Sequence, residues 1–260
     1  MATIPSIEAG ESVAVAPAPP VRPCLDHIVT EDDTPVDNMF SEKQQRLLTE
    51  PLYSSWDAGR PFLATANVGL FYAVRQPPLV PDVLLSLDVE APEEFVAKEH
   101  RSYFVWEFGK APEAVVEIVS NTVGGETTDK MLKYAQIGIV YYAIYDPDGE
   151  VQSEPLRVFV LREKSYAPCP PEWLPALGLG LTLWRGPFEN CEAVWLRWCD
   201  RQGRVIPTGA ERADQERERA EQERERAEHE RLRADRLAAR LRELGVNPDE
   251  QGDQATAVGS

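Results

Sequence analysis

Apolar residues in this chain fall into short runs separated by turn-forming residues, a pattern typical of β-strands. The runs with the clearest strand character cover 62–74, 82–89, 102–107, 114–120 and 139–146. Weaker patterns predict a strand that opens a hairpin and two more short strands, over 156–168, 179–184 and 193–198. The number and spacing of these runs predict a sheet at the centre of the fold.

Helical spacing of apolar residues occurs twice among these runs. The segment 38–59 predicts a helix with Ser41 as its N-cap and a bend or interruption near Pro51. The segment 128–137 predicts a second helix, which ends at Gly138. Strands and helices that alternate in this way predict an α/β (α+β) fold with a central mixed sheet flanked by helices.

The composition changes abruptly after residue 208. Between residues 211 and 244 the chain holds nine Glu, two Asp and ten Arg, many of them three or four positions apart. Such pairs stabilise an exposed helix by about 0.2–0.5 kcal/mol each. Alanine recurs every seven residues along this segment, as apolar residues do in a coiled coil, and Leu237, Leu241 and Leu244 extend this apolar repeat at its C-terminal end. Two interpretations stay open at this point: an isolated solvated helix, or a coiled coil that forms a homodimer.

These patterns divide the chain into four parts. Residues 1–35, rich in Ala and Pro, predict a flexible leader, and residues 36–208 predict the folded domain. Residues 209–244 form the charged helix, and residues 245–260 predict a disordered tail.

Composition narrows the class of protein. A hydrophobic share of 43% is enough for a core, whereas a net charge of −17 argues against a general nucleic-acid coat protein. It does not exclude a nuclease, since catalytic carboxylates are acidic and bound Mg²⁺ supplies positive charge. No secretory signal or membrane-spanning run is visible, so we expect a cytoplasmic protein without a membrane partner. The four cysteines form no CxxC pair, which sets a zinc site aside.

Three charged residues stand in positions that predict a site. Asp82 begins an apolar run, Glu117 lies inside the apolar VVEIV segment, and Lys130 lies near the start of the second helix. Carboxylates on neighbouring strands can share a divalent cation such as Mg²⁺, and a nearby lysine can stabilise anionic charge. Each residue also has a plain structural interpretation. Asp82 could cap a strand, Glu117 could form a structural ion pair, and Lys130 could be an exposed helix lysine.

The same residues carry a resemblance to a known family. PDVLLSL at 81–87 and VVEIVSNTVGGETTDKMLKYAQIGIVYYAIYDP at 115–147 resemble the bacterial Uma-two family, a branch of the PD-(D/E)XK nuclease superfamily. The likeness extends over roughly 36–200. It implies a restriction-endonuclease-like core, DNA as the substrate, and Mg²⁺ as the cofactor, with Mn²⁺ able to substitute.

The resemblance also implies roles for particular residues. Asp82 and Glu117 would be the metal ligands. The superfamily lysine usually stands two residues after the glutamate, where this chain has valine, so the resemblance points to Lys130 in the following helix. Lys133 is a weaker substitute. Glu42 and Tyr134 are candidate accessory residues, as an extra carboxylate and a lining side chain.

Two departures from the family pattern keep a second function open. Asn121 stands where many relatives have proline, and Val123-Gly124-Gly125 replaces a basic run. Fewer positive charges in this loop would weaken contact with the DNA backbone. The first hypothesis is a metal-dependent endonuclease. The alternative is a non-catalytic nuclease-fold scaffold that dimerises or recruits partners through its C-terminal helix.

Overall fold

A six-stranded sheet forms the centre of the computed structural model, which describes residues 38–92, 94, 96–119 and 129–245. Its strands, in spatial order, are β1 (Phe62–Ala66), β3 (Val83–Leu87), β5 (Ala114–Ile118), β6 (Tyr141–Tyr145), β7 (Leu156–Arg162) and β8 (Ser165–Cys169). Strands β5 and β6 are parallel, and the other neighbouring pairs in this sheet are antiparallel. The predicted central mixed sheet is therefore confirmed.

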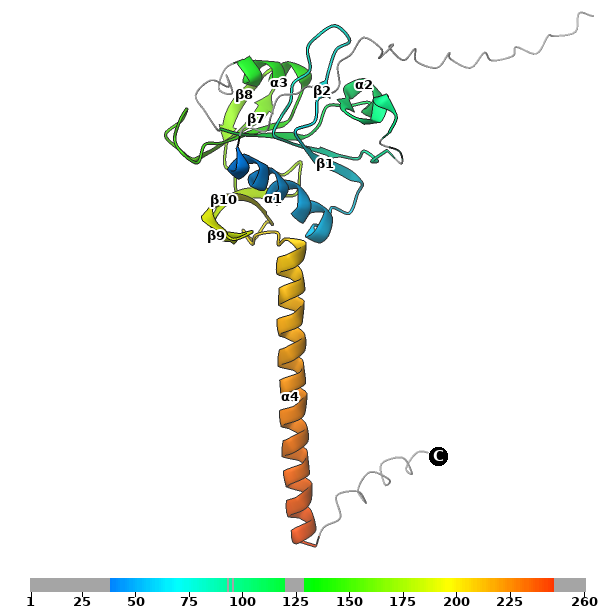
Figure 1. Cartoon of the computed structure of the whole chain (residues 1–260), viewed down its shortest axis with the longest axis vertical. Helices are drawn as coiled ribbons and strands as arrows, with labels where there is room; N and C mark the ends of the chain where they lie inside the picture. The colour runs from blue at the N-terminus through cyan, green and yellow to red at the C-terminus, as the bar shows by residue number, and fades with distance from the viewer. Residues whose placement is uncertain (1–37, 93, 95, 120–128, 246–260) are drawn as a thin grey trace, which may run out of the picture.

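Structural elements cover both faces of this sheet. Helix α1 (Met39–Ser55) lies on one face, together with an antiparallel ribbon of β9 (Gly180–Phe188) and β10 (Cys191–Cys199) (Figure 1). Helix α3 (Met131–Ile137) lies on the other face. Alternate residues of β5 enter the two cores, because successive side chains of a strand point to opposite faces. This alternation directs Glu117 toward α3.

Helix α1 forms within the segment that the sequence predicts, but its N-cap and its path at Pro51 differ from the prediction. Asn38 is the N-cap and accepts a hydrogen bond from the Ser41 backbone N–H at 2.8 Å, so the predicted cap lies three residues too late. The helix is not interrupted at Pro51 and continues to Ser55. Leu47, Leu48 and Leu52 are fully buried, and their packing offsets the hydrogen bond that proline removes.

Two of the predicted strands are wrong in extent. The run 62–74 breaks at Asn67, whose φ of 53° turns the chain, and resumes as β2 (Leu70–Phe71). Asparagine tolerates this left-handed conformation better than most residues. The run 102–107 forms only β4 (Tyr103–Phe104), which pairs with β2 in parallel.

Helical residues surround β4. The chain passes directly from β4 into the short helix α2 (Val105–Phe108). The 3₁₀ turn η1 (Lys98–His100) lies just before β4. Aromatic residues throughout the run raise its apparent strand propensity, although the chain turns here. The two short strands predicted over 179–184 and 193–198 are longer in the structure, where they form β9 and β10. These two strands pair along their full length.

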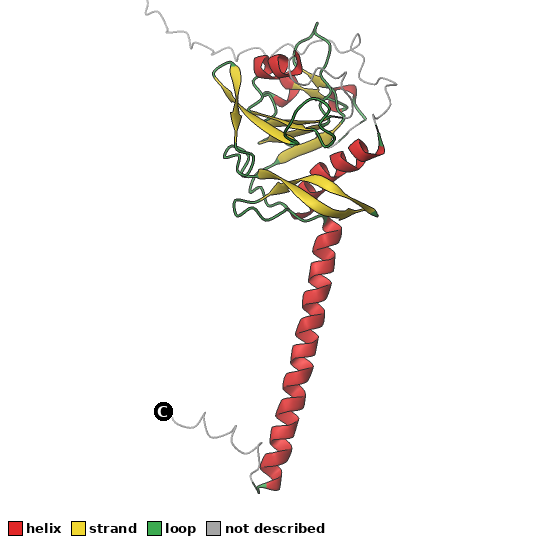
Figure 2. Ribbon diagram, turned by 90° about the vertical axis from the view of Figure 1, so that its left-hand side faces the viewer, coloured by secondary structure: helices red, strands yellow, loops and turns green. Residues whose placement is uncertain are grey.

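Helix α4 (Gly209–Glu243) projects away from the domain as a single long rod (Figure 2). Thr208 and Glu211 form a capping box at its first turn, and Arg212 Nη1 donates to the Ser54 carbonyl of α1. At about 1.5 Å per residue the rod extends for roughly 50 Å. No helix in the described ranges combines the length and the apolar character that a membrane crossing requires. The predicted leader and almost all of the predicted tail lie outside the described residues.

Candidate active site

Asp82 and Glu117 come together where β3 pairs with β5. Val83 stands opposite Val116 in an antiparallel register, so Asp82, one residue before β3, stands opposite Glu117. Opposite residues of an antiparallel pair project from the same face. Asp82 also crosses to the neighbouring strand, where its Oδ2 accepts the Ile118 backbone N–H at 2.6 Å. Two carboxyl groups that are far apart in the sequence therefore share one end of the sheet.

Helix α3 supplies two donors to the Glu117 carboxylate. Lys130 Nζ donates to Oε2 at 2.8 Å, and the Tyr134 hydroxyl donates to Oε1 at 2.6 Å. Lys130 stands at the N-cap of the helix and Tyr134 lies one turn later, so both side chains project from the same helical face. Glu117 is 1% exposed, whereas the Lys130 side chain is 27% exposed. Lys130 therefore pairs with a buried carboxyl group while part of its own side chain contacts the solvent.

Burial sets the protonation behaviour of this cluster. Burial raises the pKa of Glu117 to about 7, the positive charge of Lys130 opposes this rise, and the negative charge of Asp82 adds to it. Burial and the neighbouring Glu117 raise the pKa of Tyr134 well above its usual value. Tyr134 therefore keeps its proton at neutral pH and remains a donor to the carboxylate.

Two side chains that sequence reasoning missed hold Asp82 in place. Gln45 of α1 donates from Nε2 to Asp82 Oδ1 at 3.0 Å, and its Oε1 accepts from Asn67 Nδ2 at 3.0 Å. The Asn67 backbone N–H also donates to the Asp82 carbonyl at 3.2 Å. The usable signal was a glutamine pair, Gln44-Gln45, next to the apolar face of α1, since buried amides require partners.

Other candidate residues lie apart from these contacts. The Glu42 carboxylate, predicted as an accessory acid, pairs with Arg46 on the exposed surface of α1, and Arg46 also pairs with Glu189. Lys133 is exposed on α3. Asp146, from the last part of the family motif, accepts backbone N–H bonds from residues 150–152, which gives it a structural role in that turn.

The donor set fits a hard divalent cation that keeps most of its water. In the described part of the chain, no group of three or more His, Cys, Asp or Glu side chains is placed to hold a metal. Mg²⁺ needs only one or two carboxylates and completes its shell with water and substrate oxygens. A carboxylate has about four lone-pair sites on its two oxygens, so a hydrogen bond to one of them does not by itself prevent the group from also binding a cation. These two residues are therefore the ones that would hold the metal.

Cation binding at this pair is expected to strengthen as pH rises through 7. The raised pKa of Glu117 means that the metal-free protein keeps a proton there below about pH 7, and a cation must displace it. The pKa of Glu117 is higher in the folded protein than in the unfolded chain, so protonation of Glu117 stabilises the metal-free fold. This stabilisation is fully present below the unfolded-state pKa and is lost as pH rises through about 7. Added Mg²⁺ should consequently raise the melting temperature more at about pH 8 than at about pH 6.

Thermal unfolding with and without saturating Mg²⁺, at both pH values, measures this effect. Glu117→Gln is the control, because the amide has no proton to lose in this range. An equal Mg²⁺ shift at both pH values in the wild-type protein would contradict the expected competition between proton and cation.

The mixed sheet, with helices on both faces, defines a restriction-endonuclease-like fold, and the acid–acid–lysine cluster lies at one end of that sheet. The chain belongs to the Uma-two family. The family model described as "Putative restriction endonuclease" matches residues 33–185, more than half of the chain. This match confirms the predicted family. None of the curated proteins compared with the chain matches it.

Proposed function

We propose that this protein is a metal-dependent endonuclease that hydrolyses phosphodiester bonds in DNA. One observation carries the proposal. A carboxyl group that is 1% exposed stands opposite a second carboxyl group and accepts hydrogen bonds from a lysine and a tyrosine. Burying an acid is costly unless it is paired and hydrogen-bonded, as Glu117 is here, and acids with a pKa perturbed in this way cluster at functional sites. Membership of a restriction endonuclease family makes a phosphodiester the substrate class that fits this cluster best.

Each side chain has a defined task in this proposal. A divalent cation held by Asp82 and Glu117 would supply an activated water and neutralise developing negative charge. Lys130, which is partly exposed, would stabilise the anionic phosphoryl oxygens during attack. Tyr134 and Gln45 are positioning residues, because each bonds an acid and holds its carboxylate plane in place.

The first experiment asks whether the full chain cuts DNA and whether the cut requires a metal. Purified protein is incubated with single-stranded, duplex and supercoiled DNA in Mg²⁺, in Mn²⁺ or in EDTA. Cleavage in both metals and none in EDTA is the expected result. Cleavage that continues undiminished in EDTA would reject a metal-dependent mechanism.

A lysine pair in α3 offers a matched test of the proposed charge stabilisation. Lys130→Met is expected to lower the cleavage rate by about 100-fold or more, the effect of removing one donor to a developing anion. Lys133→Met removes the same charge from an exposed position three residues away and should leave the rate within about twofold of wild type. Single-turnover cleavage rates measure both. Equal losses in the two variants would indicate a general electrostatic effect instead of a role for Lys130.

Helix α4 favours a second candidate function, assembly with another copy of the chain. Leu237, Leu241 and Leu244 are 57%, 38% and 67% exposed, and their i, i+4, i+7 spacing forms one apolar stripe. The helix extends far enough from the domain for a second helix to lie along it. In this proposal the exposed stripe pairs with the same stripe of a second copy.

Truncation tests this assembly, provided that the first turn of α4 is kept for its contacts with the domain. Light scattering should report a dimer for the full chain and a monomer for a chain that ends at Ala220, which retains Glu211 and Arg212. Leu241→Glu in the full chain should also give a monomer. If the full chain is itself a monomer, the helix does not drive dimerisation.

A further inference from the structure

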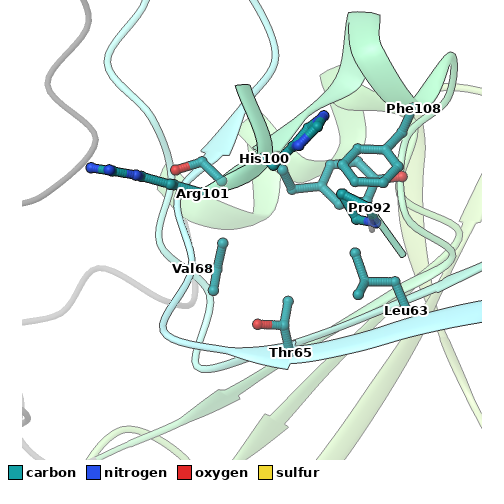
Figure 3. Close-up of a pocket in the computed structure, with 9 residues that line it drawn as sticks. Leu63, Thr65, Val68, Pro92, His100, Arg101 and Phe108 are labelled. Atoms are coloured by element: carbon teal, nitrogen blue, oxygen red, sulfur yellow. The ribbon is translucent and has the colours of Figure 1, made fainter. Parts of the chain in front are cut away.

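A pocket of about 390 Å³ lies beside the edge strand β1, and we call it the β1 pocket (Figure 3). Its lining comes from β1, the segment after it, residue 92, and the chain from the end of η1 to the end of α2. The lining residues that matter for its chemistry are Leu63, Thr65, Arg101, Ser102, Tyr103 and Phe108. This volume lies within the roughly 300–1,000 Å³ range of small-molecule sites.

The β1 pocket opens on the same sheet face as the candidate active site. Thr65 stands opposite Leu84 in the β1–β3 register, and Leu84 belongs to the core on the α3 face. Asp82 is two residues from Leu84 on the neighbouring strand. Strand spacing and rise place Thr65 about 8 Å from Asp82 along the sheet. This separation is close to the length of one nucleotide unit, so a chain that crosses the site can also reach the pocket.

The walls of the β1 pocket suit a flat, partly polar group. The rings of Phe108 and Tyr103 stack with centroids 4.4 Å apart, and Figure 3 shows Phe108 across the cavity from Leu63. Aromatic and apolar walls of this kind hold nucleobases by stacking, whatever the base. Ser102 is 4% exposed, and its hydroxyl oxygen has no hydrogen-bond partner in the described part of the chain. A buried unpaired hydroxyl group favours a ligand that can bond to it.

One arginine, Arg101, stands at the rim of the β1 pocket, in a chain whose net charge is −17. Arg101 is exposed and extends outward from the rim in Figure 3. Its Nε donates to the Val96 carbonyl. The His100 ring stands beside Arg101, and its Nδ1 contacts the Glu94 carbonyl. A guanidinium group beside an aromatic pocket adds positive charge where the phosphate of a stacked base would pass.

We propose that the β1 pocket binds one unpaired base of the nucleic acid whose backbone lies at Asp82 and Glu117. This inference rests on the proposed nuclease function and specifies its substrate class. A base inside a duplex is stacked on both sides and paired along its edge, so it must leave the helix to enter a pocket. The preferred substrate is therefore single-stranded DNA, or a duplex with an unpaired or flipped nucleotide.

Binding measured without cleavage tests the β1 pocket by itself. The full chain is titrated in EDTA with a fluorescently labelled deoxythymidine 10-mer and with a duplex of the same length, and anisotropy gives the dissociation constants. The single strand should bind about tenfold more tightly than the duplex, the scale of one stacked base. Equal affinity for the two probes would overturn the proposal.

Two variants localise the binding to the pocket. Thr65→Trp fills the cavity and should weaken single-strand binding about tenfold, while duplex affinity stays unchanged. Leu183→Trp is the control and adds the same indole to β9, away from the pocket. Arg101→Ala removes the rim charge without disturbing the core, and it should weaken single-strand binding severalfold, whereas the exposed Arg162→Ala should not.

The binding outcomes separate this inference from the proposed hydrolysis. If the single-strand preference depends on Thr65 and Arg101 but no metal supports cleavage, the pocket stands and the hydrolase proposal fails. If cleavage depends on Glu117 and yet neither pocket variant alters binding, the pocket inference fails and the hydrolase proposal stands.

Discussion

Glu117→Gln is expected to reduce metal-dependent DNA cleavage by about 1,000-fold or more. The amide retains the size of the side chain and can still accept from Lys130, but it lacks the negative charge that a divalent cation requires. The fold should persist, because the buried glutamate itself has a pKa raised to about 7 and tolerates neutralisation. Single-turnover cleavage rates and thermal unfolding of the same preparations measure the two properties.

The two aspartates that flank strand β3 provide a matched control for this prediction. Asp82→Asn should lose cleavage as severely as Glu117→Gln, because Asp82 is the second carboxyl group of the pair. Asp88→Asn changes an exposed residue at the other end of β3, where its partner is Arg60, and should leave cleavage near the wild-type rate. Cleavage by Glu117→Gln or Asp82→Asn within tenfold of wild type would show that the metal site lies elsewhere.

Glu211→Ala is expected to lower the free energy of unfolding by about 3 kcal/mol, the largest stability effect that we predict. Arg197 is 1% exposed, and both of its terminal nitrogens donate to Glu211, at 3.1 and 2.7 Å. Removing the carboxylate leaves a buried guanidinium group without its counter-charge, which costs roughly 3–5 kcal/mol in buried pairs. Glu211 is partly exposed, so the lower end of that range applies. Denaturant unfolding at neutral pH measures the change.

A second glutamate of α4 is the control for this stability prediction. Glu216 is exposed and its contact with Arg212 is long, at 3.8 Å, so Glu216→Ala should change the free energy of unfolding by less than about 0.5 kcal/mol. Similar small losses in both variants would mean that Arg197 is satisfied without Glu211, by the Ile206 carbonyl and the ring of Trp184.

Much of the fold was predictable because apolar periodicity reports burial directly. The strand prediction succeeded at β3, β5 and β6, whose residues are buried throughout and form continuous apolar runs. It failed where local propensity and the actual path of the chain disagree, as at Asn67 and after Phe104. Of the bend or interruption predicted for the first helix near Pro51, the interruption is wrong, because packing of the buried leucines keeps α1 continuous through Pro51.

The charged residues of the candidate site were predictable from the sequence, whereas the polar side chains that hold Asp82 in place were not. Glu117 stood out because an acid inside an apolar strand is costly, and Asp82 and Lys130 stood out through the family motif. Gln45 and Asn67 belong to no motif, and only the glutamine pair beside the apolar face of α1 indicates buried amides. Their partners were not predictable, because the bonds among Gln45, Asn67 and Asp82 join α1, the end of β1 and the start of β3. The accessory role predicted for Glu42 stays a prediction, and the helix residue that contacts Asp82 is Gln45.

The sequence by itself determined the features that depend on neighbours along the chain. The rod of α4 follows from its capping box and from charged pairs three and four residues apart, which act within one or two turns. Only the tertiary structure decided which groups meet across the sheet: Asp82 opposite Glu117, Tyr134 against that glutamate, and Arg197 buried beneath the first turn of α4. Strand register and burial arise from long-range pairing, in which one residue of slip would turn each side chain to the opposite face.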